Sequence, residues 1–213
     1  MLKANRKTLI IASIVTLLPV LIGIICWNHL PDVMATHFGM NNEANGFSSK
    51  AFAVFGIPVI LLAVLWFGAI VTSRDPKRQN ISPKMFSLVV WIAPFTSLVV
   101  AAILYPVNLG YALDITFFVE LLSGVMFIII GNYLPKTQAN SVVGIRAPWI
   151  NSNPDVWQKT NRLGGILFVT GGLISLITSF TPVGKYVFAS VILCICVILF
   201  VYSIVLARKK ENK

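Results

Sequence analysis

The sequence predicts an all-α integral membrane protein with six transmembrane helices. Hydrophobic residues make up 57% of its 213 residues and charged residues only 11%, whereas soluble domains carry roughly a quarter charged residues. Six apolar stretches approach the roughly 20 residues that a helix needs to cross a bilayer. They are residues 8–27, 51–71, 86–105, 113–134, 163–181 and 186–207.

Basic residues lie in alternate segments between these spans. Of the 17 Lys and Arg residues, all but Lys50 and Lys185 fall in the N-terminus, the second loop, the fourth loop or the C-terminus, where Lys213 is the last of them. Because cytoplasmic segments are rich in Lys and Arg, both termini are predicted to be cytoplasmic. The net charge of +10 therefore reflects topology and attraction to anionic lipid, and we do not expect direct nucleic-acid binding.

Two segments between spans are long enough to form functional sites, one after the first span and one after the fourth. Both open alike, with Asn28-His29-Leu30-Pro31 and Asn132-Tyr133-Leu134-Pro135. We therefore expect an N-terminal three-span half, residues 1–105 with an outer loop at 28–50. Residues 106–213 form a C-terminal three-span half with a cytoplasmic signature loop at 135–162. Inverted halves of this kind are common in transporters.

The two long segments resemble a known family. The outer stretch "LPDVMATHFGMNNEANGFSSK" resembles the domain of unknown function in the N-terminal half of SdpI-type immunity proteins, with matching residues Pro31, His37, Gly46 and Lys50. The inner stretch "GNYLPKTQANSVVGIRAPWINSNPDVWQKTNRLGG", residues 131–165 and hereafter the signature segment, resembles the SdpI signature. Its matching residues are Asn132, Pro135, Asn140, Gly144, Arg146, Pro148, Trp149, Trp157 and Gly165.

The resemblance implies a multi-pass protein of the bacterial plasma membrane that protects a cell against a secreted toxic peptide. It also implies a receptor that recruits a cytoplasmic transcriptional repressor to the membrane. The toxin is expected at the outer loop and the repressor at the signature segment. Two positions depart from the family pattern, since Ala147 replaces a common Thr and Asn161 an expected His.

The signature segment also has local signals of its own. Asn153 is a good N-cap, Pro154 suits the first helical position, and Asp155 places negative charge at the positive helix end. A helix should therefore begin there and run toward the fifth span. Its Trp and Arg residues suit either an interfacial anchor or an exposed docking platform. We expect Arg146 to bond to Asp155 or to carbonyls at a helix end.

No enzyme, metal or cofactor motif is recognised. The outer loop contains Asp32, His37 and Glu43, but their spacing matches no metal motif. The chain has two His residues, no G-x-S-x-G motif and no Cys in a predicted cytoplasmic loop. The Asn-Asn and Asn-Gly pairs of the outer loop instead indicate a turn-rich, conformationally mixed segment.

Glu120 is the informative polar residue inside a predicted span. At about 100° per residue it shares a stripe with Gly124 and Gly131, so this stripe should face the helix bundle. Glu120 is either neutral and hydrogen-bonded to a residue such as Thr16, Thr96 or Thr178, or the proton- or cation-linked site of a small secondary transporter. A structural membrane protein without a ligand is the third alternative.

Overall fold

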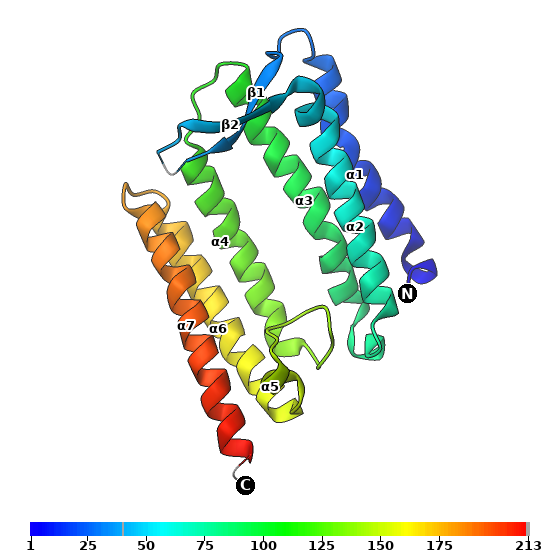
Figure 1. The fold of residues 1–213 in the computed structure, drawn as a ribbon, viewed down its shortest axis with the longest axis vertical. Helices are drawn as coiled ribbons and strands as arrows, with labels where there is room; N and C mark the ends of the chain where they lie inside the picture. Colours follow the sequence, from blue (N-terminus) through cyan, green and yellow to red (C-terminus); the bar gives the residue numbers. More distant parts are fainter. Residues whose placement is uncertain (40, 212–213) are drawn as a thin grey trace. The chain divides into compact units, whose positions relative to one another are not determined.

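The computed structural model describes residues 1–39 and 41–211, and within them six helices are long and apolar enough to cross a membrane. These confirm the six predicted spans. Lys213, counted above, lies outside the described residues. The six helices are α1 (Arg6–Ile25), α2 (Ile57–Arg74), α3 (Pro83–Asn108), α4 (Ile115–Tyr133), α6 (Pro154–Thr178) and α7 (Gly184–Glu211) (Figure 1). Shorter helical segments are Lys3–Asn5, Phe52–Gly56, Arg78–Asn80, Leu134–Lys136 and α5 (Pro148–Asn151).

The chain forms two compact units. The first contains Met1–Arg74 and Pro83–Ile115, and the second contains Asp75–Ser82 and Thr116–Lys213. The first unit therefore holds α1, α2 and α3, while the second holds nearly all of α4 and the whole of α5, α6 and α7. The halves expected at 1–105 and 106–213 and their inverted relation remain predictions.

The helices of the first unit pack around two apolar clusters. One cluster joins all three helices through residues such as Leu9, Leu65 and Phe86. The other includes Met34, Val54 and Leu104 and lies beside the segment between α1 and α2. Polar side chains cross between helices here, since Ser97 donates to Thr16 O at 2.7 Å and Tyr105 to Pro19 O at 2.9 Å. Such bonds suit a bundle in lipid, where each polar group needs a protein partner.

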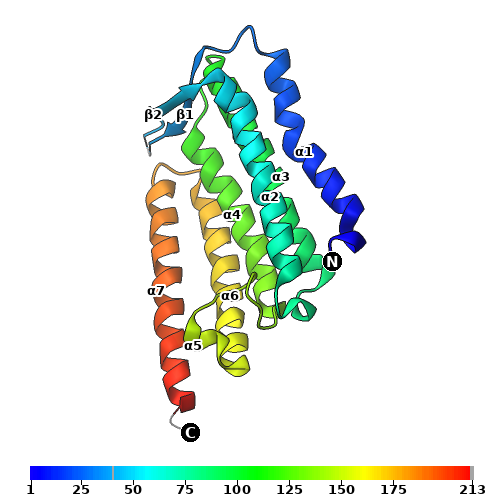
Figure 2. The ribbon, with the colours of Figure 1, turned by 45° about the vertical axis from the view of Figure 1, so that its right-hand side comes forward.

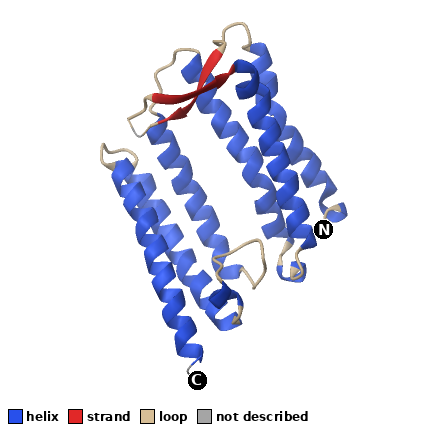
Figure 3. Cartoon of the chain, viewed as in Figure 1, coloured by secondary structure: helices blue, strands red, loops and turns tan. Residues whose placement is uncertain are grey.

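The segment between α1 and α2 contains an antiparallel hairpin of β1 (Val33–Phe38) and β2 (Ala44–Ser49) (Figure 3). This hairpin was not predicted, because the strands are short and a bulge interrupts their alternation between Ala35 and Phe38. The turn signals were informative, since Asn42 has the left-handed φ of 64° that Asn tolerates. One face of β1 packs inward through Met34, which is fully buried.

Two pairs of glycines bring α4 and α6 together in the second unit, and the helices run side by side in Figure 2. A Cβ built on Gly172 would lie 2.6 Å from Gly124 O, and one built on Gly165 would lie 2.8 Å from Gly131 O. The paired positions are seven residues apart on each helix, or about two turns. This confirms that the Gly124 and Gly131 stripe of α4 faces another helix.

Gly172→Ala is expected to force α4 and α6 apart, because the new methyl group would meet backbone that cannot rotate away. Overpacking of this kind costs about 1–3 kcal/mol, so the thermal midpoint of the purified protein in detergent should fall. Gly68→Ala is the matched control, since its Cβ would make an ordinary 3.4 Å contact with Val89. Equal midpoints for the two variants would contradict the close approach of α4 and α6.

Candidate functional sites

Trp157 is a core residue of the second unit. Its side chain is only 2% exposed, and its indole Nε1 donates a hydrogen bond to Thr137 O at 3.1 Å. Ile150 and Val156 are buried in the same cluster. The expectation of an exposed Trp157 is therefore wrong, because the signature segment folds back over the ring and leaves the residue only 2% exposed.

Asn161 lies one turn after Trp157 on α6 and holds the loop around Ile145 against that helix. Its side-chain Oδ1 accepts from Ile145 N at 2.8 Å, and its Nδ2 donates to Ile145 O and Trp157 O. Gly144 passes so close that an added Cβ would lie 2.8 Å from the Trp157 ring, and its φ is +122°. Glycine is needed here for both reasons. Asn161 thus has a structural role where the family pattern suggested His.

A second group of amide and carboxylate contacts shapes the loop before Gly144. Asn140 Oδ1 accepts from Val142 N and Val143 N, which closes a tight turn. The carboxylate of Asp75 is buried and accepts from Ser141 N at 2.7 Å. Asn80 donates to Ala139 O at 2.7 Å. Asp75 and Asn80 were missed by sequence reasoning, because their partners lie about sixty residues away along the chain.

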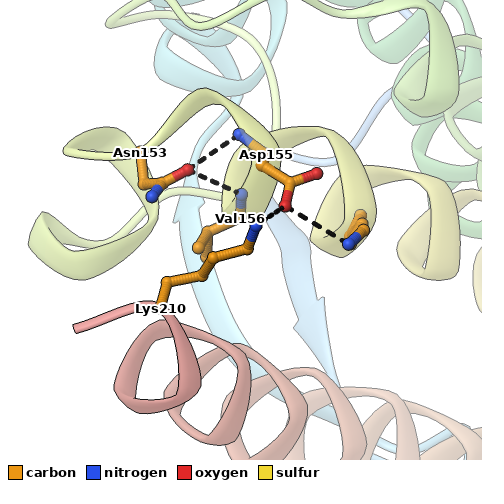
Figure 4. A network of polar contacts seen from close by, with 5 residues as sticks. Asn153, Asp155, Val156 and Lys210 are labelled. Carbon is orange, nitrogen blue, oxygen red and sulfur yellow. Dashed lines mark hydrogen bonds and ion pairs between the residues drawn. The ribbon is translucent and has the colours of Figure 1, made fainter. Parts of the chain in front are cut away.

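The N-terminus of α6 is capped as predicted. Asn153 Oδ1 accepts from Asp155 N at 2.9 Å and from Val156 N at 3.4 Å (Figure 4). The Asp155 carboxylate pairs with Lys159 at 3.2 Å and with Lys210, near the end of α7, at 2.6 Å. These pairs are partly exposed, so solvent screens them and they stabilise the protein only weakly.

Arg146 differs from the expectation. Its side chain is exposed, and no hydrogen bond or ion pair joins it to another of the described residues. The expected Arg146–Asp155 contact is wrong, because Lys159 and Lys210 already meet that carboxylate. The Arg146 side chain is therefore exposed at the protein surface.

Trp149 fixes the short helix α5 to α7. Its Nε1 donates to Ser203 Oγ at 3.1 Å, and its ring meets Phe200 edge to face with 6.1 Å between ring centres. Pro148 opens α5 and is exposed. Asn140, Trp149, Trp157, Gly144 and Gly165 thus shape the signature segment, while Asn132, Pro135, Arg146 and Pro148 remain on its surface.

A hollow of about 630 Å³ adjoins this surface, between the Asp75–Ser82 loop, residues 135–139 and the start of α6. Its rim carries two lysines and four amide side chains, Lys77, Lys136, Gln79, Asn80, Gln138 and Gln158. The hollow can therefore offer positive charge and hydrogen-bond donors, and no acidic residue lines it.

The candidate residues of the outer loop gather on the hairpin. His37 pairs with Gly46 across the strands, so closely that a Cβ on Gly46 would lie 2.8 Å from His37 Cβ. The ring Nδ1 of His37 contacts Asn45 Oδ1. Lys50 is 12% exposed and ties the hairpin base together, through Asp32 at 3.0 Å and Trp27 O at 3.2 Å. Pro31 is exposed just before β1.

Glu120 lies in the second turn of α4, close to the helix end instead of at mid-span. It is 3% exposed, and its Oε2 crowds the position that a Cβ of Gly184 would occupy at the start of α7. The carbonyl of Thr178 lies beside the same position. Among the described residues, no three His, Cys, Asp or Glu side chains could together hold a metal ion.

Comparisons with known proteins match both halves of the chain. Residues 14–62 match a domain of unknown function, DUF1648, and residues 136–206 match the SdpI/YfhL protein family. The chain is 25% identical over 203 residues to a protein named Immunity protein SdpI from Bacillus subtilis (strain 168), covering 93% of each chain. No solved structure matches the chain. Residues 136–206 are therefore similar to the SdpI/YfhL family, and the six-helix chain as a whole is similar to an SdpI immunity protein.

Proposed function

We propose that this protein is a membrane immunity protein that protects a bacterial cell against a secreted toxic peptide. The observation that carries the proposal is the similarity to Immunity protein SdpI over 93% of both chains. Similarity over that length includes both the hairpin and the signature segment. The mechanism is non-enzymatic, with the peptide bound at the hairpin on the outer face of the plasma membrane and both termini in the cytoplasm.

The experiment compares the survival of two strains of the bacterium that encodes this chain when they are exposed to secreted peptides. One has the gene deleted and the other carries it on a plasmid, and both receive the strain's own secreted peptides. Immunity predicts that the deletion strain dies at peptide concentrations that the complemented strain survives. Equal survival of the two strains at every concentration would reject the proposal.

The second part of the proposal is signalling through the cytoplasmic face. A repressor that docks there would meet exposed Arg146 and the hollow rimmed by Lys77 and Lys136. Arg is frequent among the residues that dominate protein interfaces, and lysine rims attract acidic partners. Trp149 and Trp157 shape this surface from beneath without touching the partner.

Arg146→Ala should lower repressor recruitment about tenfold or more while leaving protein level and survival near wild type. The physical reason is that the exposed Arg146 makes no hydrogen bond or ion pair with another described residue, so its loss should mainly remove contacts to a partner. Recruitment is measured as the membrane-bound fraction of a fluorescent repressor. Lys159→Ala, which removes a partly exposed cation already paired with Asp155, is the matched control. Wild-type recruitment by Arg146→Ala would remove Arg146 from the interface.

The transporter alternative depends on Glu120. The Glu120 side chain lies against the start of α7, beside the carbonyl of Thr178, and this position at a helix end favours a structural role over ion transport. Proton-coupled uptake that is lost in Glu120→Gln would support transport. If the protein neither protects the cell, recruits a repressor nor supports uptake, the remaining alternative, a structural membrane protein, would apply.

A further inference from the structure

The hairpin has two backbone edges, and one of them is already covered. The side chain of Asn108, the last residue of α3, accepts from Ala35 N at 2.8 Å and donates to Ala35 O at 3.0 Å. The amide of Asn108 thus satisfies the groups that a neighbouring strand would bond. The edge of β1 is therefore closed at its centre.

The same contacts show which way β2 faces. Both backbone groups of Ala35 point away from β2, so Ala35 and its partner Phe47 form a non-hydrogen-bonded pair. The bond from Lys50 N to Asp32 O, 2.9 Å, fits this register. The N–H and C=O of Phe47, and the N–H of Ser49, consequently point to the outer edge of β2. Within residues 1–39 and 41–211, no hydrogen bond from outside the strand pair engages the backbone groups of Phe47.

The solvent face beside this open edge is apolar. Phe47 is 62% exposed and Val33 is 63% exposed, and their strand pairing places both on the face opposite buried Met34. Open edges are templates for another extended chain, with main-chain bonds giving affinity and alternate side chains giving specificity. An extended peptide bonded to Phe47 could place an apolar side chain against its ring.

Charge around the hairpin favours one kind of peptide. The chain has a net charge of +10 and only seven acidic residues, yet Asp32, Glu43 and Asp114 all lie on or next to the hairpin. The Asp32 side chain is 98% exposed despite its contact with Lys50. Asn42, in the hairpin turn, donates to Asp114 at 2.9 Å. The hairpin is thus a local negative region that attracts cationic partners.

We propose that the outer edge of β2 binds an extended, cationic and apolar segment of the toxic peptide as a third strand. This rests on the proposed immunity function and specifies how the peptide is recognised. Binding would pair the peptide backbone with Phe47 and Ser49 and pack its apolar side chains on Phe47 and Val33. Its positive charges would lie near Asp32 and Glu43.

The decisive variant is Phe47→Pro. Because the Phe47 N–H points outward, proline at this position leaves the bonds between β1 and β2 in place but removes the donor of the open edge. Phe47→Ala is the matched variant, since it removes the ring and keeps the donor. In the survival assay, Phe47→Pro should lose protection completely at wild-type protein level. Phe47→Ala should keep part of the protection, so that the lethal peptide dose falls only several-fold below that of the wild type. Full protection by Phe47→Pro would overturn the proposal.

Amide hydrogen exchange on the purified wild-type protein tests the same edge without relying on a variant that folds. The probe is a synthetic decapeptide of alternating Val and Lys, and its control alternates Val and Glu. Saturation with the Lys peptide should slow exchange at Phe47 and Ser49 at least tenfold, and the Glu peptide should not. Unchanged exchange at both amides would overturn the strand-addition model. If the two amides already exchange slowly without peptide, and exchange more slowly as the protein concentration rises, the edge binds a second copy of the protein. That result would also overturn the strand-addition model.

Failure of the two proposals can be told apart. If the wild-type gene gives no protection, the immunity function fails, and the exchange result alone then decides whether the edge binds extended cationic peptides. If the wild-type gene protects and Phe47→Pro protects equally, immunity stands and recognition through the β2 edge is wrong.

Discussion

Replacing Trp157 by Ala is expected to remove most of the folded protein from the membrane, so that survival and repressor recruitment fall together. The indole is 2% exposed and donates its one hydrogen bond to Thr137 O. Truncating a buried Trp to Ala typically costs about 3–5 kcal/mol, a large part of the total stability of most domains. Without the ring, Gly144 and the turn around it lose the surface on which they pack. The measurements are protein level in membranes and the thermal midpoint in detergent.

Trp66→Ala supplies the matched control, since Trp66 is 40% exposed on α2 and loses much less packing. Its protein level and thermal midpoint should stay near wild type. A Trp157→Ala protein of normal amount and midpoint that fails only in recruitment would contradict the buried role, and would return Trp157 to the docking surface.

Asn161→Ala is expected to detach residues 144–146 from α6. The substitution deletes one acceptor and two donor contacts, to Ile145 N, Ile145 O and Trp157 O. The partly buried N–H and C=O of Ile145 would lose their partner, at a cost of about 1–3 kcal/mol for each group, so a loss of about 3 kcal/mol is expected. The loop that carries Arg146 should become mobile, and recruitment should fall with stability. Proteolysis of the loop in membranes and the thermal midpoint measure the two effects.

Gln158→Ala, which changes an exposed amide on the same helix, is expected to leave loop proteolysis unchanged. Asn161→His should fall between wild type and Asn161→Ala, because a neutral imidazole offers one acceptor and one donor. Faster proteolysis in Gln158→Ala than in Asn161→Ala would show that the amide of Asn161 does not hold the loop.

The features that the sequence predicted correctly depend on neighbouring residues. The spans follow from runs of apolar residues, the cap at Asn153 from three consecutive residues, and the α4 stripe from helical spacing. The hairpin was missed because its strands are short and bulged, and pairing depends on contacts across the turn. Dependence on distant contacts also explains why Asp155 was wrongly predicted as the partner of Arg146, since Lys210 reaches Asp155 from the end of α7.

Burial of Trp157 could not be predicted for a related reason. A tryptophan among Lys, Arg and Asn residues is typical of a membrane interface, and nothing near it in sequence indicates that Thr137 and Gly144 cover its ring. Asp75 and Asn108 are similar cases, each bonded to backbone more than sixty residues away. Long-range partners of this kind emerge only from the folded chain.

The central claim is that the hairpin and the signature segment act on opposite sides of the membrane, and labelling of introduced cysteines tests it most directly. Cys26, Cys194 and Cys196 are first replaced, and single cysteines are placed at Asn41, Ala44, Ser141 or Ser152, which are all exposed. In intact cells an impermeant thiol reagent should label positions 41 and 44 and leave 141 and 152 unlabelled until the cells are opened. Labelling of position 152 from outside would reverse the orientation and contradict the account.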